Sequence, residues 1–105
     1  MRKIIIDTDP GQDDAVALLL ALASPEELDV VAVTAVAGNV PLPLTEKNSR
    51  RICELADRVD VPVYAGCSRP MMRSLFTAEY VHGPTGLDGA DLPEPTMPLQ
   101  TQHGV

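Results

Sequence analysis

Positively charged side chains are scarce in this sequence. Its 105 residues include 8 Lys and Arg against 15 Asp and Glu, which gives a formal net charge of −7 and a pI near 4.5. A nucleic-acid partner is not expected, because binding that releases counterions from phosphates needs clustered cations. The same charge balance disfavours docking on an anionic membrane surface.

Long apolar runs and paired cysteines are also lacking. The uncharged stretch 15–25 has 11 residues, whereas a membrane-spanning helix needs roughly 20. The first apolar run reaches Asp7 after only three isoleucines, so no secretory signal is expected. Cys53 and Cys67 lie 14 positions apart and form no CxxC motif. We therefore expect free thiols and a cytoplasmic protein.

Three short apolar segments predict strands. Residues 3–8 and 29–37 are rich in Ile, Val and Ala and end in turn residues, a pattern typical of strands buried in a parallel sheet. Residues 61–65 form a third such segment, with Pro62 near its start.

Two helices are predicted between these strands, at residues 12–23 and 45–59. The first is apolar on nearly every side, so we expect it to be covered on more than one side. The second has Thr45 as its expected N-cap, and Leu55 and Val59 belong to its expected buried face. The order β-α-β-α-β predicts an α/β, Rossmann-like fold with a mostly parallel sheet over residues 1–66.

Residues 67–105 differ in composition. Four of the ten prolines and three of the seven glycines fall between residues 82 and 98. This segment is interpreted as a loop and a tail.

Strands in sequential order would leave one face of the sheet bare, because right-handed crossovers place both helices on the other face. A bare apolar face needs more chain or a partner to cover it, so a homo-oligomer or a longer polypeptide is expected.

Four carboxylates lie in the segment Asp7–Asp14 (DTDPGQDD), where the first strand ends and the first helix begins. Open α/β sheets bind ligands at such positions. The helix dipole accounts for Asp13 and Asp14, which point about 100° apart on a helix. It does not account for Asp7 and Asp9, which share a strand face and would repel each other without a cation or a proton.

The ligand type indicates which cation would bind. Carboxylates without nearby His or Cys suit Ca²⁺ or Mg²⁺ rather than zinc. An EF-hand loop is excluded, because Gln12 and Leu18 stand where that loop needs Gly and a bidentate Glu.

Together these segments resemble the nucleoside hydrolases, the inosine–uridine-preferring N-ribohydrolases. The segment Asp7–Asp14 is similar to the family's DxDPGxDD motif, and residues 36–39 (VAGN) to its VxGN motif. Further similarities are Asn48 in the second helix, residues 63–66 (VYAG) and the HGxxG-like loop at 82–87. The resemblance covers essentially the whole chain and implies hydrolysis of ribonucleosides to ribose and free base.

The resemblance also implies roles for individual residues at a calcium site. Asp9 and Asp14 would be Ca²⁺ ligands, and Asp9 would also accept the proton of a metal-bound water. Asp7 would support these two ligands without binding the ion itself.

A second group of implied roles concerns the nucleoside. Asp13 and Asn39 would hold ribose hydroxyls, and His82 would be a catalytic residue on the nucleobase side. Purine and pyrimidine preference stays open at this point.

The family's chains are much longer than 105 residues and supply further calcium and ribose contacts. Residues 1–105 are therefore interpreted as the N-terminal part of a single nucleoside hydrolase domain, with residues 67–105 as its active-site loop and tail. Three alternatives remain: a catalytically inactive remnant, a module that binds calcium or a nucleoside or dimerises through its bare sheet face, and a haloacid-dehalogenase-like phosphatase. The last is less favoured because Pro10 follows Asp9 and the pair Asp13–Asp14 has no role in that scheme.

Overall fold

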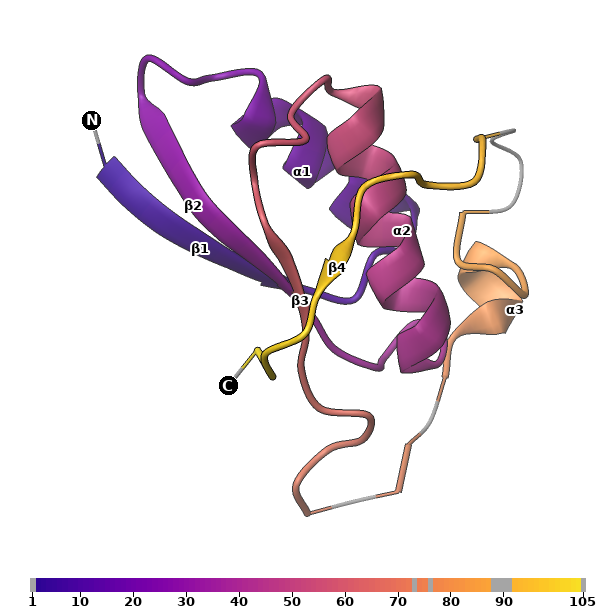
Figure 1. The fold of residues 1–105 in the computed structure, drawn as a ribbon. Coiled ribbons are helices and arrows are strands. Elements are labelled where there is room, and N and C mark those ends of the chain that lie inside the picture. The colour runs from indigo at the N-terminus through magenta and orange to yellow at the C-terminus, as the bar shows by residue number, and fades with distance from the viewer. Residues whose placement is uncertain (1, 73, 76, 88–91, 105) are drawn as a thin grey trace.

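A four-stranded parallel sheet with helices on one side forms the computed structural model of this chain (Figure 1). The structure describes residues 2–72, 74, 75, 77–87 and 92–104, and the side chain of His82 lies outside this description. The elements follow the order β1 (Arg2–Thr8), α1 (Gln12–Leu22), β2 (Leu28–Ala35), α2 (Leu42–Leu55), β3 (Val63–Ala65), α3 (Glu79–His82) and β4 (Leu99–Gln100). The predicted α/β fold is thus confirmed.

The strands follow the spatial order β1-β2-β3-β4, and each neighbouring pair is parallel. The register places Thr8 opposite Ala35, and Ala35 opposite Ala65. The carboxyl ends of the first three strands therefore meet at one edge of the sheet. The segments that follow these ends carry the acidic and amide residues of interest.

The core lies between this sheet and the two long helices. Leu18 and Leu22 of α1 and Ile52 of α2 are buried against Val33 and Val63 of the sheet. Ile4 and Ile6 pack on the same cluster, since alternate residues of a strand face the same side.

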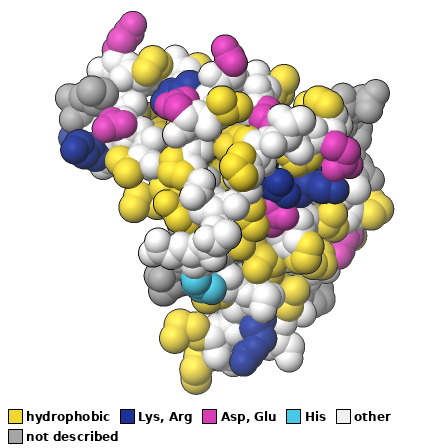
Figure 2. Space-filling view, in the orientation of Figure 1, with side chains coloured by type: hydrophobic (Ala, Val, Ile, Leu, Met, Phe, Trp, Pro, Cys, Tyr) yellow, Lys and Arg dark blue, Asp and Glu magenta, His cyan; other side chains and the backbone are white. Residues whose placement is uncertain are grey.

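The opposite side of the sheet is largely uncovered, as the sequential strand order predicts. Ile5 is 64% exposed and Val31 is 45% exposed. On the outer side of α1, Val16 and Leu20 are 67% and 70% exposed, so the expected cover on more than one side of this helix is absent from the described chain. In the space-filling view, hydrophobic side chains reach the surface among charged ones (Figure 2).

Helix α2 differs from its prediction at both ends. It begins at Leu42 after Pro41, and Pro43 is tolerated there because the first helical turn needs no backbone donor. Thr45 is therefore not the N-cap but a buried residue inside the helix, and its hydroxyl donates to the Leu42 carbonyl at 3.1 Å.

The predicted C-terminal end of this helix, at residue 59, is also wrong. The helix ends at Leu55, and Asp57 adopts a positive φ of 57° that turns the chain away. Leu55 and Val59, which were expected on the buried face, are 56% and 60% exposed.

Cys53 is a buried core residue, and both Cys53 and Cys67 are free thiols, as the sequence predicts. Burial raises the pKa of the Cys53 thiol to about 11. The thiol therefore stays protonated at neutral pH and is a poor nucleophile.

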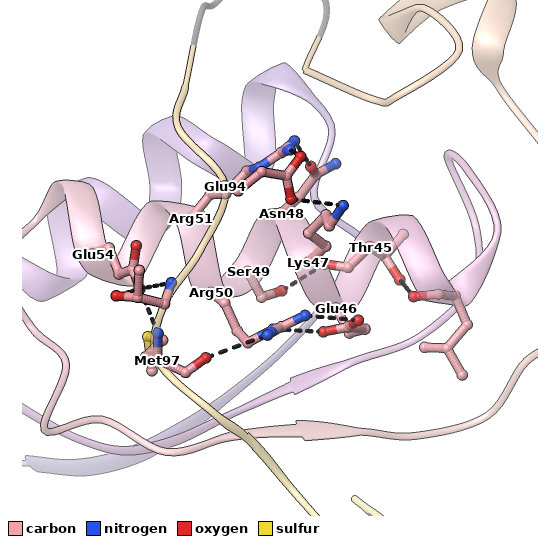
Figure 3. Close-up of polar contacts among 12 residues, drawn as sticks. Thr45, Glu46, Lys47, Asn48, Ser49, Arg50, Arg51, Glu54, Glu94 and Met97 are labelled. Carbon is pink, nitrogen blue, oxygen red and sulfur yellow. Dashed lines mark hydrogen bonds and ion pairs between the residues drawn. The ribbon is translucent and has the colours of Figure 1, made fainter.

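Residues 67–105 contain two short elements that the loop interpretation did not include, α3 and β4. The segment before β4 is held on α2 by polar contacts (Figure 3). The Glu54 carboxylate accepts hydrogen bonds from the backbone N–H groups of Thr96 and Met97, both at 2.5 Å. Glu94 forms ion pairs with Lys47 at 2.8 Å and Arg51 at 3.0 Å.

Glu54 is expected to make the attachment of this segment pH-dependent. The N–H group of Met97, assisted by Thr96, holds the pKa of the Glu54 carboxyl below its ordinary value. A lowered folded-state pKa means that the stabilisation is present above the ordinary carboxyl pKa and is lost as the pH falls through the folded value.

Replacing Glu54 by Gln should therefore loosen the attachment of residues 96–100 at neutral pH. Hydrogen exchange at the Thr96 and Met97 amides should become roughly fivefold faster, because a neutral amide oxygen accepts a hydrogen bond more weakly than a carboxylate does. Acidification from pH 7 to pH 3 should speed this exchange, corrected for intrinsic rates, in the unsubstituted protein but much less in E54Q. Equal acid sensitivity in both proteins would contradict the assignment, and E26Q on the exposed loop serves as control.

Candidate active site

The turn after β1 and the turn after β2 lie against each other at the carboxyl edge of the sheet. Their strands are paired up to Thr8 and Ala35, and the Val36 N–H donates to the Thr8 carbonyl at 2.9 Å. Because this pairing extends one residue past β2, the two turns start from a fixed separation. Asp9 and Asn39 belong to these turns.

Asn39 binds Asp9 through two hydrogen bonds. Its backbone N–H donates to Asp9 Oδ2 at 3.0 Å, and its Nδ2 donates to the Asp9 carbonyl at 2.7 Å. Both the carboxylate and the backbone of Asp9 are therefore oriented by one residue of the neighbouring strand's turn.

Gly38 makes this approach possible. A Cβ added at Gly38 would lie 2.0 Å from Asp9 Oδ2 and 2.8 Å from Asp9 Cγ. No side chain fits there, so the glycine is required by the close contact with the Asp9 carboxylate. Gly38 belongs to the VAGN segment, but its contact with Asp9 spans 29 positions and leaves no local pattern in the sequence.

Asp14, in the first turn of α1, places its carboxyl group near enough to that of Asp9 for the two to interact. Partial burial, followed by the hydrogen bond and the negative charge of Asp9, raises the pKa of the Asp14 carboxyl. A hydrogen bond from Thr8 opposes this shift. Two carboxylates held together in this way favour a proton or a cation between them.

The structure places two of the remaining predicted site residues, Asp7 and Asp13. The Asp7 carboxylate is exposed and accepts a hydrogen bond from the Thr34 hydroxyl at 2.6 Å. Asp13 is exposed in the first turn of α1. His82 ends α3, and because its side chain lies outside the described residues, its predicted role stays a prediction.

The donor set of Asp9 and Asp14 suits a hard cation, because both provide carboxylate oxygens. The described residues contain no group of three or more His, Cys, Asp or Glu that could hold a metal ion, so neither Asp7 nor Asp13 completes such a group. Ca²⁺ takes six to eight oxygen ligands. The described part of the chain thus offers a fitting but partial set of ligands.

The fold and the acidic residues together define a class of protein: an α/β domain with a cluster of carboxylates after its first parallel strand. Comparison with known proteins is more specific. The sequence model of the family described as inosine-uridine preferring nucleoside hydrolase matches residues 4–105. The chain belongs to this family.

Relatives of known sequence agree with this membership. A pyrimidine-specific ribonucleoside hydrolase, RihA, of Photobacterium profundum is 54% identical over 104 residues, which are 99% of this chain and 33% of the relative. An uncharacterized protein of Schizosaccharomyces pombe is 52% identical over 103 residues, with 98% of this chain and 33% of the relative covered.

Solved structures show the same fold. A purine-preferring ribonucleoside hydrolase from Gardnerella vaginalis matches with a TM-score of 0.89 and 28% identity, covering 98% of this chain and 34% of its own. A plant nucleoside hydrolase matches with a TM-score of 0.78 and 41% identity, covering 91% and 31%. The chain therefore spans about a third of the length of these relatives. Within the described residues, no helix is long and apolar enough to cross a membrane.

Substituting Asp14 by Asn should stabilise the metal-free protein at neutral pH. A raised folded-state pKa means that Asp14 costs stability as the pH rises above the ordinary carboxyl value, and the uncharged amide removes this cost. For a partly exposed pair we expect about 0.5 kcal/mol after solvent screening, or a rise in Tm of roughly 2–4 °C at pH 7 in EDTA.

The gain should shrink as the pH falls towards 4, where the carboxyl of the unsubstituted protein is itself protonated. Thermal unfolding at both pH values measures this, with D60N as a control whose carboxylate pairs with Arg58 instead. The compared quantity is the Tm of D14N minus the Tm of the unsubstituted protein. If this difference is smaller at pH 7 than at pH 4, the result contradicts the contact between the two carboxyls.

Substituting Gly38 by Ala should displace the Asp9 carboxylate, because the new methyl group would overlap Oδ2. We expect a loss of stability of about 1–3 kcal/mol, the usual cost of inserting a methyl group into filled space. Gly104→Ala is the matched control, since its nearest neighbour would be Thr34 Cγ2 at 3.3 Å. Urea unfolding measures both, and equal stability of the two variants would show that the close approach is absent.

Proposed function

We propose that this chain carries part of the active site of a calcium-dependent enzyme that hydrolyses the N-glycosidic bond of ribonucleosides to ribose and free base. The proposal is supported by the Asp9 carboxylate at the carboxyl edge of the sheet, which is held by Asn39 beside Gly38 and has the Asp14 carboxyl next to it. The hydrogen bonds from Asn39 and the close contact with Gly38 hold the Asp9 carboxylate at this place, beside another negative charge. A bound cation explains why such a pair is kept.

The chemistry of the bond agrees with this arrangement. Cleavage of an N-glycosidic bond passes through an oxocarbenium-like state, whose positive charge is stabilised by nearby carboxylates. A calcium ion held by Asp9 and Asp14 would lower the pKa of a bound water and so supply a nucleophile at neutral pH. Asp9 would accept the proton of the attacking water, and its orientation by Asn39 suits this role.

Other residues are proposed to bind the nucleoside. Asp13 is exposed at the start of α1, and Asn39 lies beside Asp9, so both stand near the place where a ribose would meet the carboxylate pair. Contacts with the ribose hydroxyls would fix the conformation of the sugar ring, so that binding energy stabilises the transition state. Asp7 is proposed to support the site from the strand, and His82 to lie on the nucleobase side.

The proposed domain extends beyond the site described. Two aspartates supply too few oxygens for calcium, and the relatives are about three times as long as this chain. We propose that residues 1–105 are the N-terminal part of one nucleoside hydrolase domain. The 105-residue chain alone would then show little or no hydrolysis.

Pyrimidine ribonucleosides are the proposed first substrates. The relative named pyrimidine-specific is 54% identical to this chain, whereas the one named purine-preferring is 28% identical. We further propose a cytoplasmic enzyme that forms a homo-oligomer, with the uncovered apolar sheet face as the reason for association.

Ribose release from uridine, cytidine and inosine tests the function in the protein as its gene encodes it. Substituting Asp9 by Asn should lower kcat/KM by roughly 10²–10⁴-fold, because the proton acceptor is lost. Asp60→Asn changes a surface carboxylate paired with Arg58 and should leave the rate within twofold.

Removal of calcium with a chelator should abolish ribose release, and added Ca²⁺ should restore it. Unchanged hydrolysis in the chelator would contradict the calcium site. A folded protein without hydrolysis on any of the three nucleosides would favour the alternative of an inactive remnant or a binding module. Faster hydrolysis of inosine than of uridine would contradict the substrate preference.

A further inference from the structure

Asn48 is a fully buried polar residue that joins two segments of the site. It lies in the middle of α2 with 0% of its surface exposed. Its Nδ2 donates to the Thr85 carbonyl at 2.6 Å and to the Pro10 carbonyl at 3.3 Å. An amide nitrogen has two hydrogens, so one side chain satisfies two carbonyls from segments 75 positions apart.

The Pro10 carbonyl needs such a donor. Pro10 is itself fully buried and directly follows Asp9, and its hydrogen bond with Asn48 is also buried. A buried carbonyl without a partner costs about 1–3 kcal/mol. The amide of Asn48 therefore stabilises the turn that carries the Asp9 carboxylate.

The segment 83–87 is packed closely onto the same turn. Gly86 has φ +88°, and a Cβ added there would lie 3.0 Å from the Pro10 carbonyl oxygen, 3.0 Å from Asn48 Nδ2 and 3.2 Å from Val40 Cγ2. The start of α3 is attached nearby, because the Ala78 N–H donates to the Asn39 carbonyl at 2.7 Å. Residues 78–87 are thus tied to both turns of the site.

The orientation of the Asn48 amide is itself supported. Arg51 Nη1 lies 3.5 Å from Asn48 Oδ1, and Arg51 also pairs with Glu94 of the segment before β4 (Figure 3). A cationic donor on Oδ1 favours the amide orientation that directs Nδ2 at the two carbonyls.

We propose that Asn48 is a positioning residue that holds the Asp9–Gly11 turn in register with the 83–87 segment and thereby sets the geometry of the Asp9–Asp14 cation site. This inference rests on the proposed calcium site, and it assigns to Asn48 no contact with metal or substrate. Its effect on the site passes through the Pro10 carbonyl.

Substituting Asn48 by Ala tests the proposal in the protein as its gene encodes it. Ser49→Ala is the matched control: Ser49 is the next residue of α2, is also 0% exposed, and donates to the Thr45 carbonyl at 2.9 Å within the helix. Three quantities are measured for both variants: Ca²⁺ affinity by calorimetry, Tm, and hydrogen exchange of segments 11–15 and 83–87.

We expect N48A to weaken Ca²⁺ binding by at least tenfold and to speed exchange in both segments. S49A should lower the Tm but leave Ca²⁺ affinity within twofold and the two segments unchanged relative to the rest of the chain. If N48A and S49A lower the Tm alike while Ca²⁺ affinity stays unchanged, the positioning role is wrong.

Gly86→Ala keeps the test decisive if N48A does not fold. The added methyl group separates the 83–87 segment from the turn without emptying the core. This variant should therefore also weaken Ca²⁺ binding and speed hydrogen exchange in both segments. Faster exchange in segment 83–87 alone would contradict the coupling. If the unsubstituted protein binds no Ca²⁺, the proposed calcium site fails, and faster exchange of segments 11–15 and 83–87 in N48A then still decides whether Asn48 holds them together.

Discussion

The two hydrogen bonds from Asn39 to Asp9 are the contact on which the rest of the site depends. They join the turn after β1 to the turn after β2, and both turns start from strands already paired through Thr8 and Ala35. The absence of a side chain at Gly38 lets the carboxylate reach this position. The paired strands and Asn39 thus fix the direction of the Asp9 carboxylate, which is the preorganisation that the proposed catalytic role would require.

A cost accompanies this arrangement. With Asp9 fixed, Asp14 at the start of α1 is partly buried beside another carboxylate, and both the burial and Asp9 raise its pKa. Natural proteins keep such like-charge pairs where the strain serves a function. The metal-free site is therefore less stable at neutral pH than an uncharged version, and cation binding would convert the repulsion into attraction for both carboxylates.

Local patterns were sufficient to predict the core elements and the acidic cluster. The three isoleucines before Asp7 predict β1 because an apolar run followed by turn residues has few other solutions. The start of α2 was wrong by three residues, since Thr45 is a good N-cap and Leu42 after Pro41 gives no such signal. The short strand β4 was missed because its position depends on Glu54, which lies over forty residues earlier.

The contacts within the site were the least predictable part. The family motifs placed Asp9, Asp14 and Asn39 in one site, but nothing in the local sequence indicates that Asn39 donates to Asp9 or that Gly38 touches it. Asn48 is a comparable case, because an Asn in mid-helix is ordinarily a weak helix former whose partners lie on other segments. Long-range hydrogen bonds of this kind are visible only once the chain is folded.

The most decisive measurement is a titration of the Asp14 side chain by carboxyl carbon NMR, because the pKa of Asp14 reports on its burial beside Asp9 and on a cation bound there. In EDTA the pKa of Asp14 should lie above the ordinary carboxyl value, and in saturating calcium it should fall below that value. An ordinary pKa that is the same in EDTA and in calcium would show that the two carboxyls neither meet nor share a cation.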